Sequence, residues 1–193
     1  MEVIIIFFIA HWYLSLFFQT FFHHRYASHG AFTMSRGWEK VFFVLSWMFQ
    51  GSNYLSPYGY GVMHRMHHAY ADTEDDPHSP KYDESIWKMM WKTKTIYSSI
   101  ANKKIEVDSR FTDGVPEWNP FDKYARSWMS RIFWGALYVG VYYQFATEWW
   151  LWLLLPAQFA LSPIHGAIIN WFAHKYGYTN YKLGETTKNL LPL

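Results

Sequence analysis

Residues 64–78 have the sequence HRMHHAYADTEDDPH, which is the most informative stretch for the fold. His64, His67 and His68 stand at positions i, i+3 and i+4, which share one face of a helix over an arc of roughly 100°. Imidazole side chains suit iron, copper, zinc and nickel. Burying three of them together without a metal carries a large desolvation penalty. The stretch therefore predicts a metal-binding helix.

Another histidine cluster lies upstream, in the sequence HHRYASH at residues 23–29. It is the first cluster along the chain, and residues 64–78 are the second. His24 and His29 are five residues apart, so on a regular α-helix their side chains diverge by about 140°. Either the helix ends between them or they bind two different metals. Two metals would also account for the number of candidate ligands.

A third region, HGAIINWFAH at residues 165–174, places Asn170 and His174 four residues apart on one helical face. A structural role is the simpler interpretation of His165, because polar side chains inside a membrane often only bond a neighbouring helix. His23 points about 100° away from the histidine that follows it. For His23 a structural and a metal-binding role stay equally open.

Apolar runs on both sides of the histidines predict a membrane protein. The composition is 51% hydrophobic and 22% aromatic, and Trp and Tyr concentrate at membrane interfaces. Residues 3–22, 132–147 and 149–171 are interpreted as spans, each of which needs roughly 20 residues. Residues 38–57 are interrupted by polar side chains. They are expected to be re-entrant or interfacial, because a crossing there would separate the first two histidine clusters.

The charge distribution predicts an orientation. Residues 58–127 carry ten Lys or Arg, whereas the turn at Glu148 carries none. The positive-inside rule places 58–127 on the cytoplasmic side. Within it, residues 85–100 combine apolar and lysine side chains in a pattern typical of a helix on a membrane surface. A net charge of +2 gives no indication of a nucleic-acid partner, and the lack of cysteine excludes disulfides and thiolate metal sites.

These features predict an all-α fold in one domain, residues 1–193. We expect an integral-membrane helical bundle with a cytoplasmic helical cap that carries the histidine motifs.

The motifs resemble those of the stearoyl-CoA desaturase-like family of membrane fatty acid desaturases. The sequence HRYASH at 24–29 matches the HRxxSH box of that family, and HRMHH at 64–68 matches its HRxHH box. DPH at 76–78 and NWFAH at 170–174 match its DPH and NxxxH elements. The boxes follow the order of the family from about residue 20 to the end, and their combination is highly specific.

The resemblance implies a site for two iron ions on the cytoplasmic side of a membrane. The short chain and lean loops indicate a bacterial inner membrane. The implied ligands are His24, His29, His64, His67, His68 and His174, with Asn170 acting through a water. Residues expected to orient these ligands from behind are Asp76, His78, Arg25 and Arg65, and possible additional ligands are His23 and His165.

The resemblance also implies an activity. Such an enzyme introduces a double bond into a long-chain acyl substrate, carried as acyl-CoA or acyl-lipid, and uses O₂ and two electrons. The electrons come from a separate donor such as a ferredoxin, a rubredoxin or a b-type cytochrome, and membrane lipids surround the chain. A further HNxHH box near the end of the family's sequences is missing, so we expect a C-terminally truncated chain with weakened metal binding and activity.

Two other functions remain open. A membrane di-iron hydroxylase or ketolase carries similar histidine boxes but adds oxygen to the carbon. A non-enzymatic haem-binding or metal-binding membrane protein would place facing histidines within its spans. Most of the histidines here lie in or beside polar segments instead, which favours the desaturase.

Overall fold

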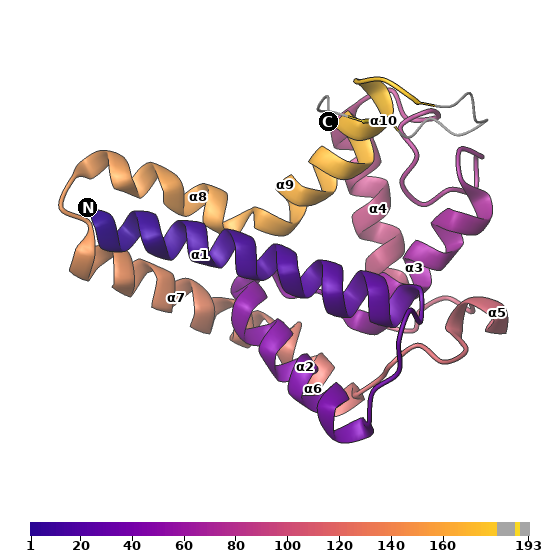
Figure 1. Cartoon of the computed structure of the whole chain (residues 1–193), viewed down its shortest axis with the longest axis horizontal. Coiled ribbons are helices and arrows are strands. Elements are labelled where there is room, and N and C mark those ends of the chain that lie inside the picture. The colour runs from indigo at the N-terminus through magenta and orange to yellow at the C-terminus, as the bar shows by residue number, and fades with distance from the viewer. Residues whose placement is uncertain (181–187, 190–193) are drawn as a thin grey trace.

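The computed structural model describes residues 1–180 and 188–189 (Figure 1). Within these residues the chain is helical, and the one β contact is an isolated bridge between Tyr178 and Asn189. The predicted all-α class is confirmed.

Three helices lie side by side at the end of the molecule that holds the N-terminus (Figure 1). They are α1 (Glu2–Phe18), α7 (Trp128–Phe145) and α8 (Leu154–Phe159), the last of which follows a 3-10 turn, η3 (Trp149–Leu153). Ile4, Tyr142 and Leu151 are buried between them. Large apolar side chains also cover the outside, as a hydrocarbon environment requires; examples are Ile6, Tyr143 and Leu153.

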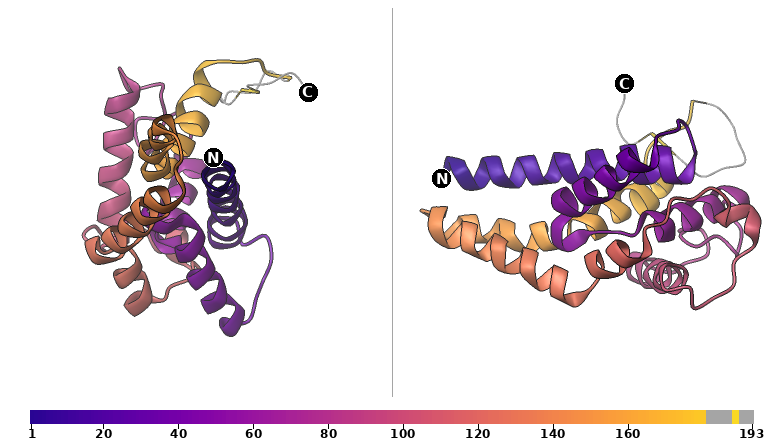
Figure 2. Two further views of the ribbon diagram at one scale, coloured as in Figure 1. Left: turned by 90° about the vertical axis from the view of Figure 1, so that its left-hand side faces the viewer. Right: turned by 90° about the horizontal axis from the view of Figure 1, so that it is seen from below.

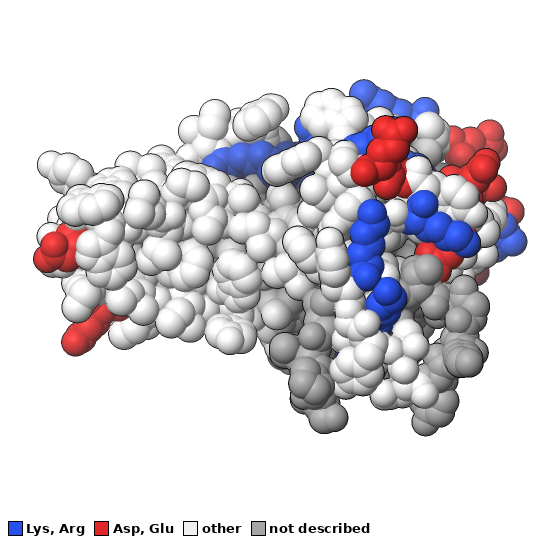
Figure 3. All heavy atoms as spheres, turned by 90° about the horizontal axis from the view of Figure 1, so that it is seen from above, with Lys and Arg blue, Asp and Glu red and all other residues white. Residues whose placement is uncertain are grey.

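Glu2–Ser28 is the one continuous helix among the described residues that is long and apolar enough to cross a membrane. Trp149–Phe159 and Leu161–Lys175 meet this condition only as a pair, which bends by 67° at the break between them. On the face drawn in Figure 3, most charged side chains gather at the end opposite the N-terminus. The apolar helix at the N-terminus indicates membrane association, and the predicted topology of three spans stays a prediction.

The apolar segment 38–57 is divided among several elements. α2 (Arg36–Gln50) is followed by a 3-10 turn, η2 (Gly51–Asn53), and then by the N-cap residue of α3, Ser56, whose hydroxyl accepts from the Gly59 N–H. The turn reverses the chain, so that α3 packs against the helix that follows α1. The expectation that residues 38–57 are re-entrant or interfacial stays a prediction.

The polar part of the chain forms a cap of shorter helices around the end of α1. Its elements are α3 (Pro57–Tyr70), α4 (Ile86–Ala101), α5 (Ser109–Thr112) and α6 (Asn119–Ala125). α4 is formed largely by the segment expected to be a surface helix, residues 85–100. Its Trp87 and Trp91 side chains are largely exposed. Val62, Ile100 and Phe111 are buried between α3, α4 and α5.

The C-terminal helices run from the apolar end back to the cap (Figure 2). They are α9 (Leu161–Ala167), a π-helical segment η4 (Ile168–Phe172) and α10 (Ala173–Lys175). α9 contacts α4. This return brings the third histidine region to the cap.

Candidate metal centre

The first histidine cluster lies on a π-helix. α1 continues into η1 (Gln19–Ser28), whose backbone bonds join residues five apart; the His29 N–H donates to the His24 carbonyl at 3.1 Å. Residues five apart therefore lie about one turn apart, and the Nε2 atoms of His24 and His29 approach to 3.2 Å. The divergence of about 140° applies only to a helix with 3.6 residues per turn. Of the two alternatives that it left, the helix does end between the two histidines, at Ser28.

Glycines allow α3 to approach its neighbours closely. A Cβ at Gly61 would lie 3.1 Å from the Ala27 carbonyl oxygen, and a Cβ at Gly59 would lie 2.7 Å from the Ala101 Cβ. α3 thus packs against η1 on one side and against α4 on the other. The close contact with η1 brings the second histidine cluster to the first.

Arg65 joins α3 to the end of η1 by hydrogen bonds. Its Nε donates to the Ser28 carbonyl at 2.7 Å, and its Nη2 donates to the Ala27 carbonyl at 3.2 Å. Carbonyls at a helix C-terminus lack hydrogen-bond donors within the helix. The N–H groups of the Arg65 guanidinium provide those donors. Its Nη1 also donates to the Asp113 carbonyl at 2.6 Å. Arg65 therefore holds the backbone behind the histidines.

Replacing Arg65 with glutamine is expected to weaken the binding of any metal held by these histidines by roughly 10–100-fold, as the loss of outer partners of a metal site does. The glutamine amide cannot reach all three carbonyls, so η1 and α3 lose their register. The measurement is iron retained against increasing chelator. Arg110→Gln is the matched control, because Arg110 donates at the surface to the Tyr70 hydroxyl; equal loss from both variants contradicts the assignment.

Four imidazoles from η1 and α3 converge, those of His24, His29, His64 and His68. The His29 Nε2 lies 3.2 Å from the Nε2 atoms of both His24 and His64, and the His68 Nε2 lies 3.0 Å from that of His64. An imidazole nitrogen carries either one hydrogen or one lone pair. His29 and His64 therefore cannot make two good hydrogen bonds each through one atom. The arrangement suits lone pairs directed at a shared ion.

Burial and electrostatics keep His64, the histidine at the centre of this group, neutral. Burial, followed by the neighbouring histidines, lowers the pKa of His64 well below its usual value. A neutral imidazole has a lone pair to offer, which is the form that metal binding requires.

A second group surrounds His67, on the same helix. The His67 ring stacks on that of His78 with centroids 4.1 Å apart, and the His174 ring centroid lies 6.1 Å from that of His67. Ligand atoms of His67, Asp76 and His78 lie within 4.8 Å of one another. His174 comes from α10, so the far end of the chain reaches this group. The expected ligands are thus divided between two adjacent groups.

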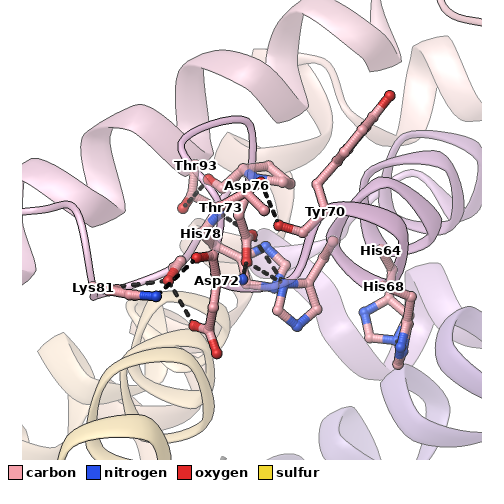
Figure 4. Close-up of polar contacts among 12 residues, drawn as sticks. His64, His68, Tyr70, Asp72, Thr73, Asp76, His78, Lys81 and Thr93 are labelled. Atoms are coloured by element: carbon pink, nitrogen blue, oxygen red, sulfur yellow. Dashed lines mark hydrogen bonds and ion pairs between the residues drawn. The ribbon is translucent and has the colours of Figure 1, made fainter. Parts of the chain in front are cut away.

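Asp76 orients the second group from the loop after α3 (Figure 4). Its carboxylate is fully buried and accepts from the His67 Nδ1 at 2.9 and 3.0 Å. The backbone N–H groups of Asp72 and His78 also donate to it. Burial alone would raise the pKa of Asp76, but these hydrogen bonds lower it below the ordinary value. The carboxylate holds His67 with Nε2 available, the geometry of an outer partner to a metal-bound histidine.

His78 lies next to the Asp76 carboxylate, but one nitrogen of its ring makes no hydrogen bond within the described residues. Its Nδ1 is buried and has no hydrogen-bond partner among the described residues. Burial is the largest influence on the side chain and lowers the pKa of His78 to about 3. The ring is therefore neutral, so it adds no positive charge beside the imidazole of His67 on which it stacks.

A cavity of about 1200 Å³ adjoins both groups. His24, His64, His78 and Asn170 contribute to its lining. Its apolar lining comes from the membrane-type helices and includes Leu16, Ile132, Ala136, Val139, Phe159 and Ile169. The volume exceeds the roughly 300–1,000 Å³ of ordinary small-molecule sites. A long, flexible apolar ligand would fit this combination of size and lining.

Three other residues singled out from the sequence lie outside both groups. His23 is fully buried and its Nε2 lies 2.9 Å from the Leu55 carbonyl, so it joins η1 to the loop before α3. His165 is buried in α9 with its ring edge-on to Trp12. The Arg25 side chain is exposed and makes no hydrogen bond or ion pair within the part of the chain that the structure describes.

Sequence reasoning missed three residues that shape the site. Tyr60 lines the cavity and its ring stacks on that of His64, with centroids 5.7 Å apart. Gly61 permits the contact with η1, and Asn53 lies at the break between α8 and α9. The PYGYG run at 57–61 carried a signal, since glycines inside a helix indicate close backbone approach.

Comparison with family models adds to this geometry. The model of the fatty acid desaturase family matches residues 2–190. The chain belongs to this family. Comparison with curated proteins and comparison with solved structures each found no match. Membership makes this desaturase-family chain an oxidoreductase of fatty acyl substrates, in a family known for iron-dependent catalysis. It does not assign the stearoyl-CoA desaturase-like subgroup.

Proposed function

We propose that this chain is an O₂-dependent fatty acyl desaturase of the stearoyl-CoA desaturase-like kind, with two histidine-bound iron ions. The observation that carries the proposal is the convergence of four imidazole Nε2 atoms beside a large cavity with an apolar lining. Family membership supplies the class of reaction.

The spacing of the four nitrogens suits a shared metal ion. With metal–nitrogen bonds of about 2.1 Å, two ligand nitrogens on one ion lie roughly 3.0–3.4 Å apart. The Nε2 separations of 3.0 to 3.2 Å fall in this range. Imidazole suits iron, copper, zinc and nickel, and family membership favours iron among them.

The described residues offer four imidazoles to the first ion and two to the second. His24, His29, His64 and His68 would hold the first ion, and His67 and His174 would hold the second, with Asn170 acting through a water. His67 already has its Nδ1 bound by Asp76, so only its Nε2 is left to bind a metal. His78 would support this ring by stacking.

The iron ions would supply the oxidising power, with O₂ and two electrons, that no amino-acid side chain has. The remaining tasks belong to the chain. The cavity would bind the acyl chain along its apolar lining and exclude water from the reacting carbons. By fixing the acyl chain, it would hold one pair of methylenes beside the histidine groups. The products are a double bond and two waters, after two protons are taken up.

The location and partners form part of the proposal. The apolar helices would lie in a bacterial inner membrane, with the cap and both histidine groups on the cytoplasmic side. The substrate would be a long-chain acyl-CoA or acyl-lipid. Electrons would come from a separate ferredoxin, rubredoxin or b-type cytochrome.

Product analysis tests the reaction. Bacterial cells that lack a desaturase of their own should gain unsaturated fatty acids when they express this chain together with a candidate electron donor. Mass spectrometry of the extracted fatty acids, compared with cells that express the donor alone, measures the gain. Acyl products with added oxygen and no double bond would instead identify a hydroxylase or ketolase.

A further inference from the structure

The helix that follows α7 is broken at a defined place. Pro163 lacks an N–H, and its ring clashes with the carbonyl four residues earlier in a regular helix. That carbonyl belongs to Phe159, where α8 ends, and α9 begins at Leu161. The two parts meet at 67°. A break of this kind leaves backbone carbonyls of one helix and N–H groups of the next without partners.

Asn53 bonds both sides of the break. Its Nδ2 donates to the Gln158 carbonyl at 2.8 Å, and its Oδ1 accepts from the Ser162 N–H at 3.4 Å. The Ser162 hydroxyl also donates to the Asn53 carbonyl at 2.9 Å. Asn53 is 4% exposed, so no bulk water can replace these bonds. One amide side chain therefore satisfies an acceptor from α8 and a donor from α9.

The break directs the end of the chain to the second histidine group. His174 lies 13 residues beyond Leu161, which corresponds to about 20 Å of helix. Over that length, a swing of 67° moves a residue by about 20 Å. A straight continuation would therefore carry His174 away from His67, whose ring centroid is now 6.1 Å from it.

Asn53 also belongs to the element that leads into the metal-binding helix. It ends η2, and α3 starts four residues later at Pro57. The bonds across the break thus connect the start of the helix that carries His67 with the helix that carries His174.

We propose that Asn53 is a positioning residue that fixes the angle between α8 and α9 and thereby brings Asn170 and His174 to the second metal group. The role of Asn170 and His174 as ligands rests on the proposed function, whereas the role of Asn53 in the angle does not. An amide is required because the site needs a donor and an acceptor together. Aspartate is of the same size but, when ionised, offers only acceptors.

A distance measurement without metal tests the angle. The chain has no cysteine, so cysteines introduced at Glu84 and Lys175, both exposed, are the only sites for spin labels. In the metal-free chain, Asn53→Ala is expected to shift or broaden the label-to-label distance by several ångströms, towards the limit of about 20 Å set by helix geometry. Asn53→Asp is expected to do the same. Asn102→Ala is the matched control, since Asn102 donates to the Ser98 carbonyl at the end of α4. A distance distribution in both Asn53 variants equal to that of the control overturns the proposal.

Iron content tests the consequence for the metal group. The unsubstituted chain is expected to hold about two irons and the Asn53 variants about one, because His24, His29, His64 and His68 are untouched. Two irons retained in both variants overturn the link to the second group. A failure of the unsubstituted chain to bind two irons counts against the proposed function, and the label distances still decide the angle.

Discussion

Gly51→Ala is expected to lower the unfolding temperature strongly and to reduce the yield of folded protein. Gly51 has φ of +55° and ψ of −124°, a combination that costs a residue with a side chain on the order of 1–3 kcal/mol. A Cβ there would lie 1.7 Å from the Tyr138 hydroxyl oxygen and 2.9 Å from the ring carbon that bears it. Overpacking of this kind costs about 1–3 kcal/mol more. Together these penalties, about 2–6 kcal/mol, are a large share of the roughly 5–15 kcal/mol by which domains are stable.

The damage has a specific cause. The Tyr138 hydroxyl accepts from the Ser52 N–H and lies 3.2 Å from the His11 Nε2, so it cannot move without breaking buried bonds. The measurement is the yield and thermal unfolding temperature of detergent-purified protein. Gly140→Ala is the control, because Gly140 has open space where a Cβ would go. Equal unfolding temperatures for the two variants would contradict this account of the turn.

His64→Ala is expected to abolish desaturation and to remove the first iron. Its Nε2 contacts those of His29 and His68 at 3.2 and 3.0 Å, so it is central to the group. We expect the loss in iron affinity to exceed the roughly 10–100-fold typical of outer partners. The measurements are unsaturated product per cell and iron per chain.

His23→Ala is the informative comparison for that variant. His23 is the neighbour in sequence of a proposed ligand, but its ring nitrogens face backbone carbonyls. Its loss should lower the unfolding temperature while the folded fraction keeps its iron. If His64→Ala retained both irons, or His23→Ala lost one at unchanged stability, the division of roles between these residues would be wrong.

Local periodicity made the second histidine cluster predictable. His64, His67 and His68 stand on α3 as their spacing indicated, because Ser56 and Pro57 start a regular helix there. The all-α class followed from the length and composition of the apolar runs. Asp76 was singled out as a partner for a ligating histidine, and the structure shows its bonds to His67.

The parts of the fold and of the site that were not predicted depend on departures from regular helices. The π-helical turns of η1 alter which residues share a face of the helix. No residue pattern in QTFFHHRYAS indicated these turns. Hydrophobicity alone predicts one span over 149–171, whereas Pro163 within that run is a sequence signal for the bend that the structure shows. The division of the ligands into two groups required long-range contacts, such as that of His174 with His67.

Metal analysis of the detergent-purified, unsubstituted chain tests the central claim most directly. Iron, zinc and copper should be measured together in protein produced with iron supplied. Two histidine groups with the observed geometry predict about two irons per chain and little zinc or copper. A chain that is folded, as judged by its helical content, but holds no iron, or holds zinc in its place, would contradict the proposed di-iron centre.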